Sequence, residues 1–154
     1  MAPADLLSPL EGQREETLRV LDSLTDADLD RAVNGSGRNI RRVFAHVASA
    51  ELGQAFLIRL AAEGEVVHLS AEDRDRFNEA QVEDSDGWDC RRLKDELRES
   101  RMTLRECFQL LTEEDLDRAI RWPEWPARTI RSSIPYMLEH EDSHVDEVRR
   151  ALER

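Results

Sequence analysis

Three of the four histidines of this chain lie where helical spacing can bring their rings together. His140 and His144 are four residues apart, so a helix would place both imidazoles on one face. His46 lies far upstream, at the edge of an apolar stripe. Three neutral imidazoles that leave a coordination position open suit zinc, nickel or iron. If the two segments pack together, we expect His46, His140 and His144 to bind one divalent metal ion.

Polar residues also interrupt the two apolar stripes that would carry these histidines. Glu141 falls in the middle of the last stripe, Gln54 near the middle of the earlier stripe, and Glu51 near its edge. A bare carboxylate in an apolar core is costly unless a cation or a metal is close. We therefore predict that Glu141 is catalytic, as an extra ligand, a hydrogen-bond acceptor or a base for bound water. Glu51 and Gln54 become candidate pocket residues. The alternative is that Glu141 pairs with a buried arginine in a protein without a metal.

Residues 140–144 also fit the H-E-x-x-H pattern of metalloprotease helices. The longer form of that pattern needs a third histidine at position 150, which is Arg150 here. The protease interpretation is therefore poor. The third ligand is expected upstream, where His46 can supply it.

Three aromatic residues near the last predicted helix are further pocket candidates. Trp122 and Trp125 lie in a proline-containing loop just before that helix. They either form the wall of a substrate pocket or close the end of the core. Tyr136 occupies the position in the second half of the chain that His46 occupies in the first, and it either lines the pocket or packs.

The charge of the chain excludes several classes of partner. The net charge of −12 repels phosphate backbones, and no basic cluster with interleaved aromatic residues offsets it. We predict no nucleic-acid binding. No apolar stretch is long enough to span a bilayer, and the first residues lack the pattern of a signal peptide. These features predict a cytoplasmic protein that does not bind membranes, in which Cys90 and Cys107 stay reduced.

Apolar residues recur at helical spacing in four long segments. These segments are expected to begin at Ser8, Asn39, Asp89 and Thr129, and Ser8 is predicted to cap the first. A shorter helix is predicted over residues 70–82, with Ser70 as its cap. Pro135 is expected to kink the last helix or to delay its regular start to Ser132 or Ser133.

An internal repeat organises these segments. Residues 24–33 (LTDADLDRAV) match residues 111–120 (LTEEDLDRAI), and each copy precedes a loop, a polar cap and an Ile-Arg pair. The chain is therefore predicted to contain two helical hairpins in series, joined by a long connection over residues 65–86 that includes the short helix. The expected fold is an all-α four-helix bundle in a single domain, residues 1–154.

Two of these segments resemble a known family. Residues 41–51 (RRVFAHVASAE) are similar to the second-helix motif of DinB-like proteins, with His46 and Glu51 in place. Residues 137–148 (MLEHEDSHVDEV) are similar to the family's C-terminal helix, in which a His-x-x-x-His pair precedes a glutamine. Glu147 stands in that glutamine position here.

The resemblance implies a four-helix bundle with an uncommon helix order, a histidine-bound divalent metal (zinc or nickel before iron) and, often, a homodimer. Characterised relatives are thiol-dependent transferases or isomerases that use bacillithiol, mycothiol or glutathione. A metal with an open position makes a bound thiol a thiolate near neutral pH, and the thiolate then attacks a small electrophile. The alternative is a stress-associated protein of the same fold that binds a metal or small molecule without turnover.

Overall fold

The four long helices expected from the apolar spacing are present, with a fifth in the connection. The computed structural model describes residues 1–66, 68–122 and 129–153. Its α-helices there are α1 (Ser8–Asp22), α2 (Ile40–Ala62), α3 (Ala71–Glu83), α4 (Cys90–Gln109) and α5 (Ile130–Leu152). Short 3-10 helices are η1 (Pro3–Leu7), η2 (Asp26–Asp30), η3 (Asp84–Gly87) and η4 (Asp115–Asp117). The strands β1 (Ala32–Val33) and β2 (Arg38–Asn39) pair antiparallel. The predicted all-α fold is confirmed.

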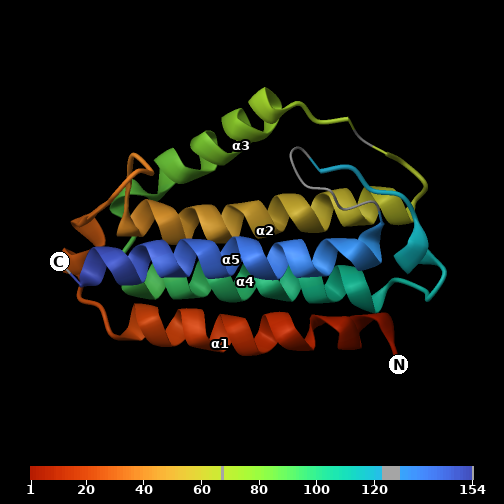
Figure 1. The fold of residues 1–154 in the computed structure, drawn as a ribbon, viewed down its shortest axis with the longest axis horizontal. Coiled ribbons are helices and arrows are strands. Elements are labelled where there is room, and N and C mark those ends of the chain that lie inside the picture. Colours follow the sequence, from red (N-terminus) through yellow and green to blue (C-terminus); the bar gives the residue numbers. More distant parts are fainter. Residues whose placement is uncertain (67, 123–128, 154) are drawn as a thin grey trace.

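The helices of the bundle pair across the two halves of the chain. Within the bundle, α2 packs against α4 and α5, and α1 packs against α5 and α4. α2 and α4 run in one direction, and α1 and α5 run in the other (Figure 1). α3 lies outside the bundle, against the outer side of α2 (Figure 1).

The core consists of two apolar clusters separated by polar side chains. One cluster includes Leu10, Ile58 and Phe108, and the other includes Phe44 and Leu97. Between them lie five buried polar residues, contributed by all four helices of the bundle: Arg14, Thr17, Glu51, Arg101 and Glu141. We call these five residues the polar layer.

The internal repeat is visible as repeated local structure. The hydroxyl of Thr25 accepts a hydrogen bond from the Asp28 amide at 3.3 Å, and the hydroxyl of Thr112 accepts one from the Asp115 amide at 3.2 Å. An ion pair then ties each copy to the helix that follows it: Asp30–Arg41 at 2.6 Å and Asp117–Arg131 at 3.2 Å. Each copy of the repeat therefore forms a similar entry into α2 or α5.

Most predicted helix boundaries are confirmed, the cap predicted at Ser8 was wrong, and one of the two effects expected of Pro135 is excluded. Asn39, Ser70 and Thr129 cap their helices as expected. Ser8 is not a cap, because η1 runs directly into α1. The start of α5 is not delayed either. Pro135 lies inside the helix, where it removes one amide donor, and the Thr129 cap fixes the first turn before it.

A helix that crosses a bilayer must be both long and apolar. Within residues 1–66, 68–122 and 129–153, no helix is long and apolar enough to do so.

Candidate metal centre

The rings of the three predicted ligands meet between α2 and α5. Nε2 of His46 lies 3.3 Å from Nε2 of His140, and one ring nitrogen from each of His46, His140 and His144 lies within 4.8 Å of the others. Two nitrogens that bind one tetrahedral ion at about 2.0–2.1 Å would be roughly 3.3–3.4 Å apart. The spacing of His46 and His140 therefore fits a shared ion, and His144 completes a three-nitrogen set.

The same three rings contact one another by their edges. Ring centroids are 5.2 Å apart for His46 and His140, 4.7 Å for His46 and His144, and 4.6 Å for the pair on α5. The interplanar angles are 62° to 82°. The three rings are therefore packed edge to face and are not stacked.

Electrostatics keep two of these rings neutral. Burial lowers the pKa of His46 to about 2 and that of His140 to about 4, and the nearby His144 ring adds to both effects. The positive charges of Arg38 and Arg74 lower both pKa values further. Neutral imidazole is the form that binds a metal, so no proton has to be displaced from these two rings near neutral pH.

The surroundings of His144 and His46 also bear on how well the three histidines fit a metal ion. Nδ1 of His144 lies 3.2 Å from a carboxylate oxygen of Glu147, one turn along α5. A proton on Nδ1 would be donated to that carboxylate, which leaves Nε2 of His144 as the ligand atom. Nδ1 of His46 is buried and has no hydrogen-bond partner among the described residues. The fit to a divalent ion rests instead on the Nε2 atoms of His46 and His140, which are spaced for a shared ion, and on Nε2 of His144, which its contact with Glu147 leaves available.

A large cavity opens beside the histidines. Its volume is about 700 Å³, and it lies between α2, α3 and Trp122, with His46 and His140 in its wall. Volumes of this size are typical of small-molecule sites. Its largest lining residues, besides the histidines, are Arg38, Phe56, Arg74, Phe77 and Trp122.

Only some of the predicted pocket residues line the large cavity. Gln54 and Trp122 line the large cavity, and the Trp122 indole donates a hydrogen bond to Ser133 at 2.7 Å. Tyr136 is half-buried and does not line that cavity. Trp125 lies outside the described residues.

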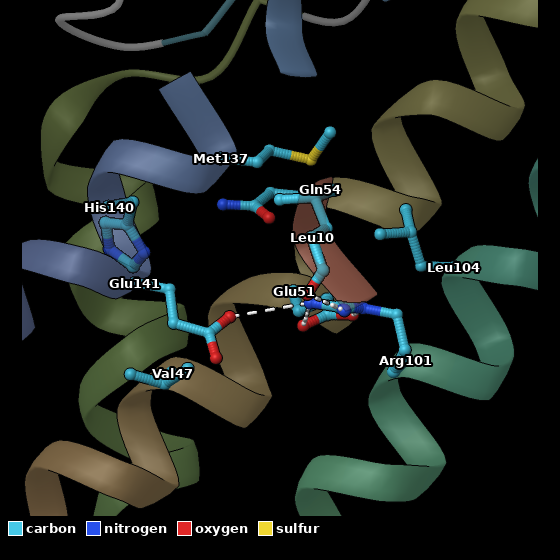
Figure 2. A pocket seen from close by; sticks show the side chains of 9 residues that line it. All are labelled: Leu10, Val47, Glu51, Gln54, Arg101, Leu104, Met137, His140 and Glu141. Carbon is cyan, nitrogen blue, oxygen red and sulfur yellow. Dashed lines mark hydrogen bonds and ion pairs between the residues drawn. The ribbon is translucent and has the colours of Figure 1, made fainter. Parts of the chain in front are cut away.

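Glu51 and Glu141 border a much smaller space inside the bundle. This void measures about 10 Å³, room for one water molecule, and is also lined by Gln54 and His140. The Glu141 side chain extends toward Glu51 and Arg101 (Figure 2). Glu141 therefore borders the metal centre only through its neighbour His140.

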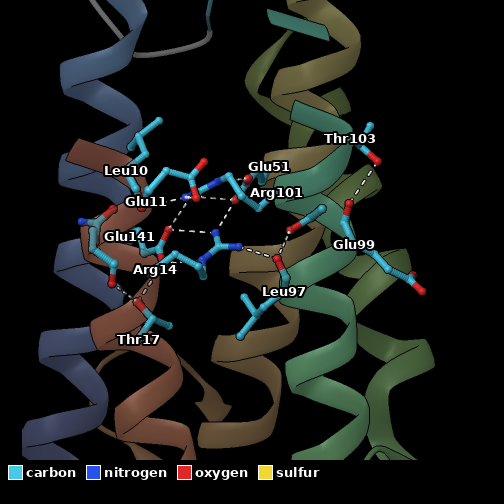
Figure 3. Close-up of polar contacts among 12 residues, drawn as sticks. Leu10, Glu11, Arg14, Thr17, Glu51, Leu97, Glu99, Arg101, Thr103 and Glu141 are labelled. Carbon is cyan, nitrogen blue, oxygen red and sulfur yellow. Dashed lines mark hydrogen bonds and ion pairs between the residues drawn. The ribbon is translucent and has the colours of Figure 1, made fainter. Parts of the chain in front are cut away.

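Both oxygens of Glu141 are held by the polar layer (Figure 3). Oε1 accepts hydrogen bonds from Arg14 at 2.8 Å and from Thr17 at 2.7 Å. Oε2 accepts from Arg14 at 2.9 Å and from Arg101 at 3.4 Å. Burial alone would raise the pKa of Glu141, but the hydrogen bonds and charge of Arg14 hold it below its usual value. A carboxylate bound in this way is a weak base.

Glu51 completes the layer between the same two arginines. Arg101 donates to it at 2.6 Å, and Arg14 also donates to it. Two arginines thus balance two glutamates, which satisfies the requirement that buried charges be paired.

Sequence reasoning missed the two arginines, although a signal was present. Arg14 lies between Leu10 and Thr17 on the apolar side of α1, and Arg101 lies between Leu97 and Leu104 on the stripe of α4. A cation at a core position is as anomalous as a carboxylate there.

The cysteines take no part in the metal centre. Cys90 and Cys107 are half-buried free thiols, and burial raises the pKa of both, that of Cys90 to about 11. Neither is a reactive thiolate near neutral pH.

Comparison with known proteins places this geometry in context. The model of the DinB superfamily matches residues 9–148. A crystal structure of the mycothiol-dependent maleylpyruvate isomerase has the same fold, with a TM-score of 0.78 and 14% identity over 96% of this chain and 61% of that chain. A mutant of that enzyme in which one histidine is alanine matches equally well, with a TM-score of 0.78 and 13% identity. This chain thus spans 61% of the length of these structures. No curated protein matches it in sequence.

Proposed function

The chain belongs to the DinB superfamily, and we propose that it is a divalent-metal-dependent enzyme that joins a small-molecule thiol to a small electrophile. One observation carries the proposal: three imidazoles converge, and two of them line a cavity large enough for a small molecule. The superfamily is what directs the proposal toward thiol chemistry.

Each ligand residue has a defined task in this proposal. His46, His140 and His144 hold the ion, and Glu147 orients the His144 ring through its Nδ1 proton. When bound, the ion supplies a Lewis acid that lowers the pKa of a coordinating thiol toward neutral pH. The cavity beside His46 and His140 receives the reactants and limits the access of water.

Glu141 is better suited to positioning than to proton transfer. Arg14, Thr17 and Arg101 occupy its oxygens, so it anchors α5 within the bundle next to His140. The catalytic role expected from the sequence stays a prediction. Its contacts support a positioning residue that fixes the helix carrying two ligands.

The thiol and the metal are chosen for testing by their chemistry. Mycothiol is the first thiol to test, because the solved structures that share this fold belong to a mycothiol-dependent enzyme. Bacillithiol and glutathione follow. Zinc and nickel suit three imidazoles best, and iron is third.

A thiol-transfer assay tests the proposal. The purified protein, loaded with zinc or nickel, would be mixed with each thiol and monochlorobimane, whose conjugates fluoresce. We expect conjugation above the uncatalysed rate with at least one thiol, lost in H140A and kept in H68A, since His68 lies outside the triad. Equal rates in H140A and the unmodified protein would contradict the proposal. Stable metal binding without turnover for any thiol would favour the non-enzymatic alternative, a stress-associated binding protein.

Two further expectations belong to the same proposal. A homodimer is tested by sedimentation at several protein concentrations. A cytoplasmic location is tested by cell fractionation.

A further inference from the structure

Two arginine side chains line the cavity beside the histidines, although the chain as a whole carries a net charge of −12. Arg38 comes from β2 and Arg74 from α3, and both line the cavity together with His46 and His140. Both arginines are close enough to these rings to depress their pKa values through charge. Two guanidinium groups therefore lie in the wall of the cavity that also holds the histidines.

Two acids that pair with these arginines, Glu79 and Asp75, are more exposed than the arginines themselves. The Arg38 side chain is 19% exposed, whereas that of its partner Glu79 is 53% exposed. The Arg74 side chain is 30% exposed and that of Asp75 is 65% exposed. Asp73 and Asp75 also line the cavity. An anion inside the cavity would thus meet two partly desolvated guanidinium groups.

Much of the remaining wall consists of exposed apolar side chains. Phe56 and Phe77 are 59% and 46% exposed, and Leu52 and Leu69 are 38% and 37% exposed. All four line the cavity. Large apolar side chains gathered at a concave surface are typical of a binding site.

We propose that this cavity binds a ligand with an apolar body and a carboxylate, and that Arg38 and Arg74 anchor the carboxylate. Guanidinium groups bind carboxylates through strong charge-assisted hydrogen bonds. The apolar body would lie against Phe56 and Phe77. Because the family's thiols are strongly polar, we assign this ligand as the electrophile. Only that assignment rests on the proposed function; the binding itself does not require a metal.

Calorimetric titration with a matched pair of compounds tests the anchor. Hydrocinnamate and hydrocinnamyl alcohol share an apolar body, and only the first has a carboxylate. With protein dialysed against a chelator, we expect the acid to bind about tenfold more tightly than the alcohol. R38Q and R74Q should each weaken binding of the acid by about three- to tenfold and leave binding of the alcohol unchanged.

Control variants separate the anchor from general effects of charge and of structure. R59Q on α2 and R76Q on α3 remove the same charge from side chains that are 71% and 72% exposed and do not line the cavity. Both should bind the acid normally. E79Q removes the ion pair of Arg38 but keeps the guanidinium, so it should bind the acid at least as tightly as the unmodified protein does. Weakening by E79Q that equals the effect of R38Q would assign Arg38 a purely structural role.

Several results would overturn the proposal. Equal affinities for the acid and the alcohol, or binding of neither, would remove the anchor. So would binding of the acid only in the zinc-loaded protein with no effect of R38Q, because the carboxylate would then coordinate the ion. Binding of glutathione that weakens in R38Q while binding of hydrocinnamate does not would assign the arginines to the thiol instead. Failure of thiol transfer alone would leave the result with metal-free protein intact, so the two proposals fail separately.

Discussion

His140 and Glu141 are adjacent on α5, yet their side chains belong to different structures. The His140 ring lies 3.3 Å from that of His46, whereas the Glu141 carboxylate accepts hydrogen bonds from Arg14 at 2.8 and 2.9 Å. The polar layer and the metal centre therefore share one turn of helix. Ion pairs that link the helices in the middle of the bundle thus anchor the part of α5 that carries His140 and His144.

Removal of the Glu141 carboxylate should destabilise the fold strongly. E141A leaves Arg14 buried without its main partner, and breaking a buried pair from one side costs about 3–5 kcal/mol. Urea denaturation of metal-free protein measures the loss. E139A removes an exposed acid from the same helix and should change the free energy of unfolding by less than about 0.5 kcal/mol.

The same variants decide between the two roles of Glu141. E141Q keeps the shape of the side chain, and if it remains folded it should bind metal with unchanged stoichiometry. If it remains folded but loses the metal, Glu141 is a ligand, as one of the sequence-based interpretations held. Equal stability of E141A and E139A would show that the polar layer contributes little.

Stability of the metal-free protein should fall with mild acid. The pKa values of His46 and His140 in the folded protein are below the ordinary 6.5. In mild acid these two rings therefore bind protons in the unfolded chain but stay neutral in the folded protein. Their contribution is complete above the unfolded pKa and is lost as the pH falls from about 6.5 toward 4. Between about pH 7 and pH 5, each histidine should cost roughly 2 kcal/mol. The pKa of Glu141 is lowered from 4.5, so protonation of Glu141 reduces stability only at pH values below this range.

Urea unfolding at several pH values, with a chelator present, measures this dependence. H46L removes one titrating ring and should make the decline with acid clearly shallower, while H68A should leave the slope unchanged. A decline in H46L as steep as in the unmodified protein would contradict the assignment of the lowered pKa to His46.

The repeated caps should contribute equally to stability. T25A and T112A each remove a hydroxyl that accepts a hydrogen bond from a backbone amide, which costs about 1 kcal/mol. Because the two caps belong to separate copies of the repeat, their effects should add in the double variant. T103A, whose hydroxyl only donates to a carbonyl within α4, is the control and should cost less. If the two variants lose very different amounts of stability, the two copies of the repeat are similar in sequence but do not contribute equally to the free energy of unfolding.

Signals in the sequence were sufficient for the helices and for the convergence of the three histidines. Apolar spacing and polar caps predicted α2, α3 and α5, and the four-residue spacing of His140 and His144 placed both rings on one face. The position of His46 on the α2 stripe indicated the third ligand. The helices and the shared face of His140 and His144 need only residues within a few turns, whereas the convergence with His46 also required the two helices to pack together.

Features that depend on how several helices pack together were harder to predict from the sequence. The sequence marked Glu141 as anomalous but did not identify Arg14 and Arg101 as its partners, because arginine is usually assigned to a solvated helix face. The large cavity depends on where α3 settles against α2, which periodicity alone does not fix. The short pairing of β1 with β2 was also missed, since each strand has only two residues.

Metal analysis of single-histidine variants tests the shared ion most directly. Each protein would be loaded with zinc, passed through a desalting column and analysed for metal per chain. We predict one ion per chain for the unmodified protein and for H68A, and loss of most of the metal in H46A, H140A and H144A. Retention of a full equivalent by all three variants, or its absence from the unmodified protein, would contradict a metal centre built from these histidines.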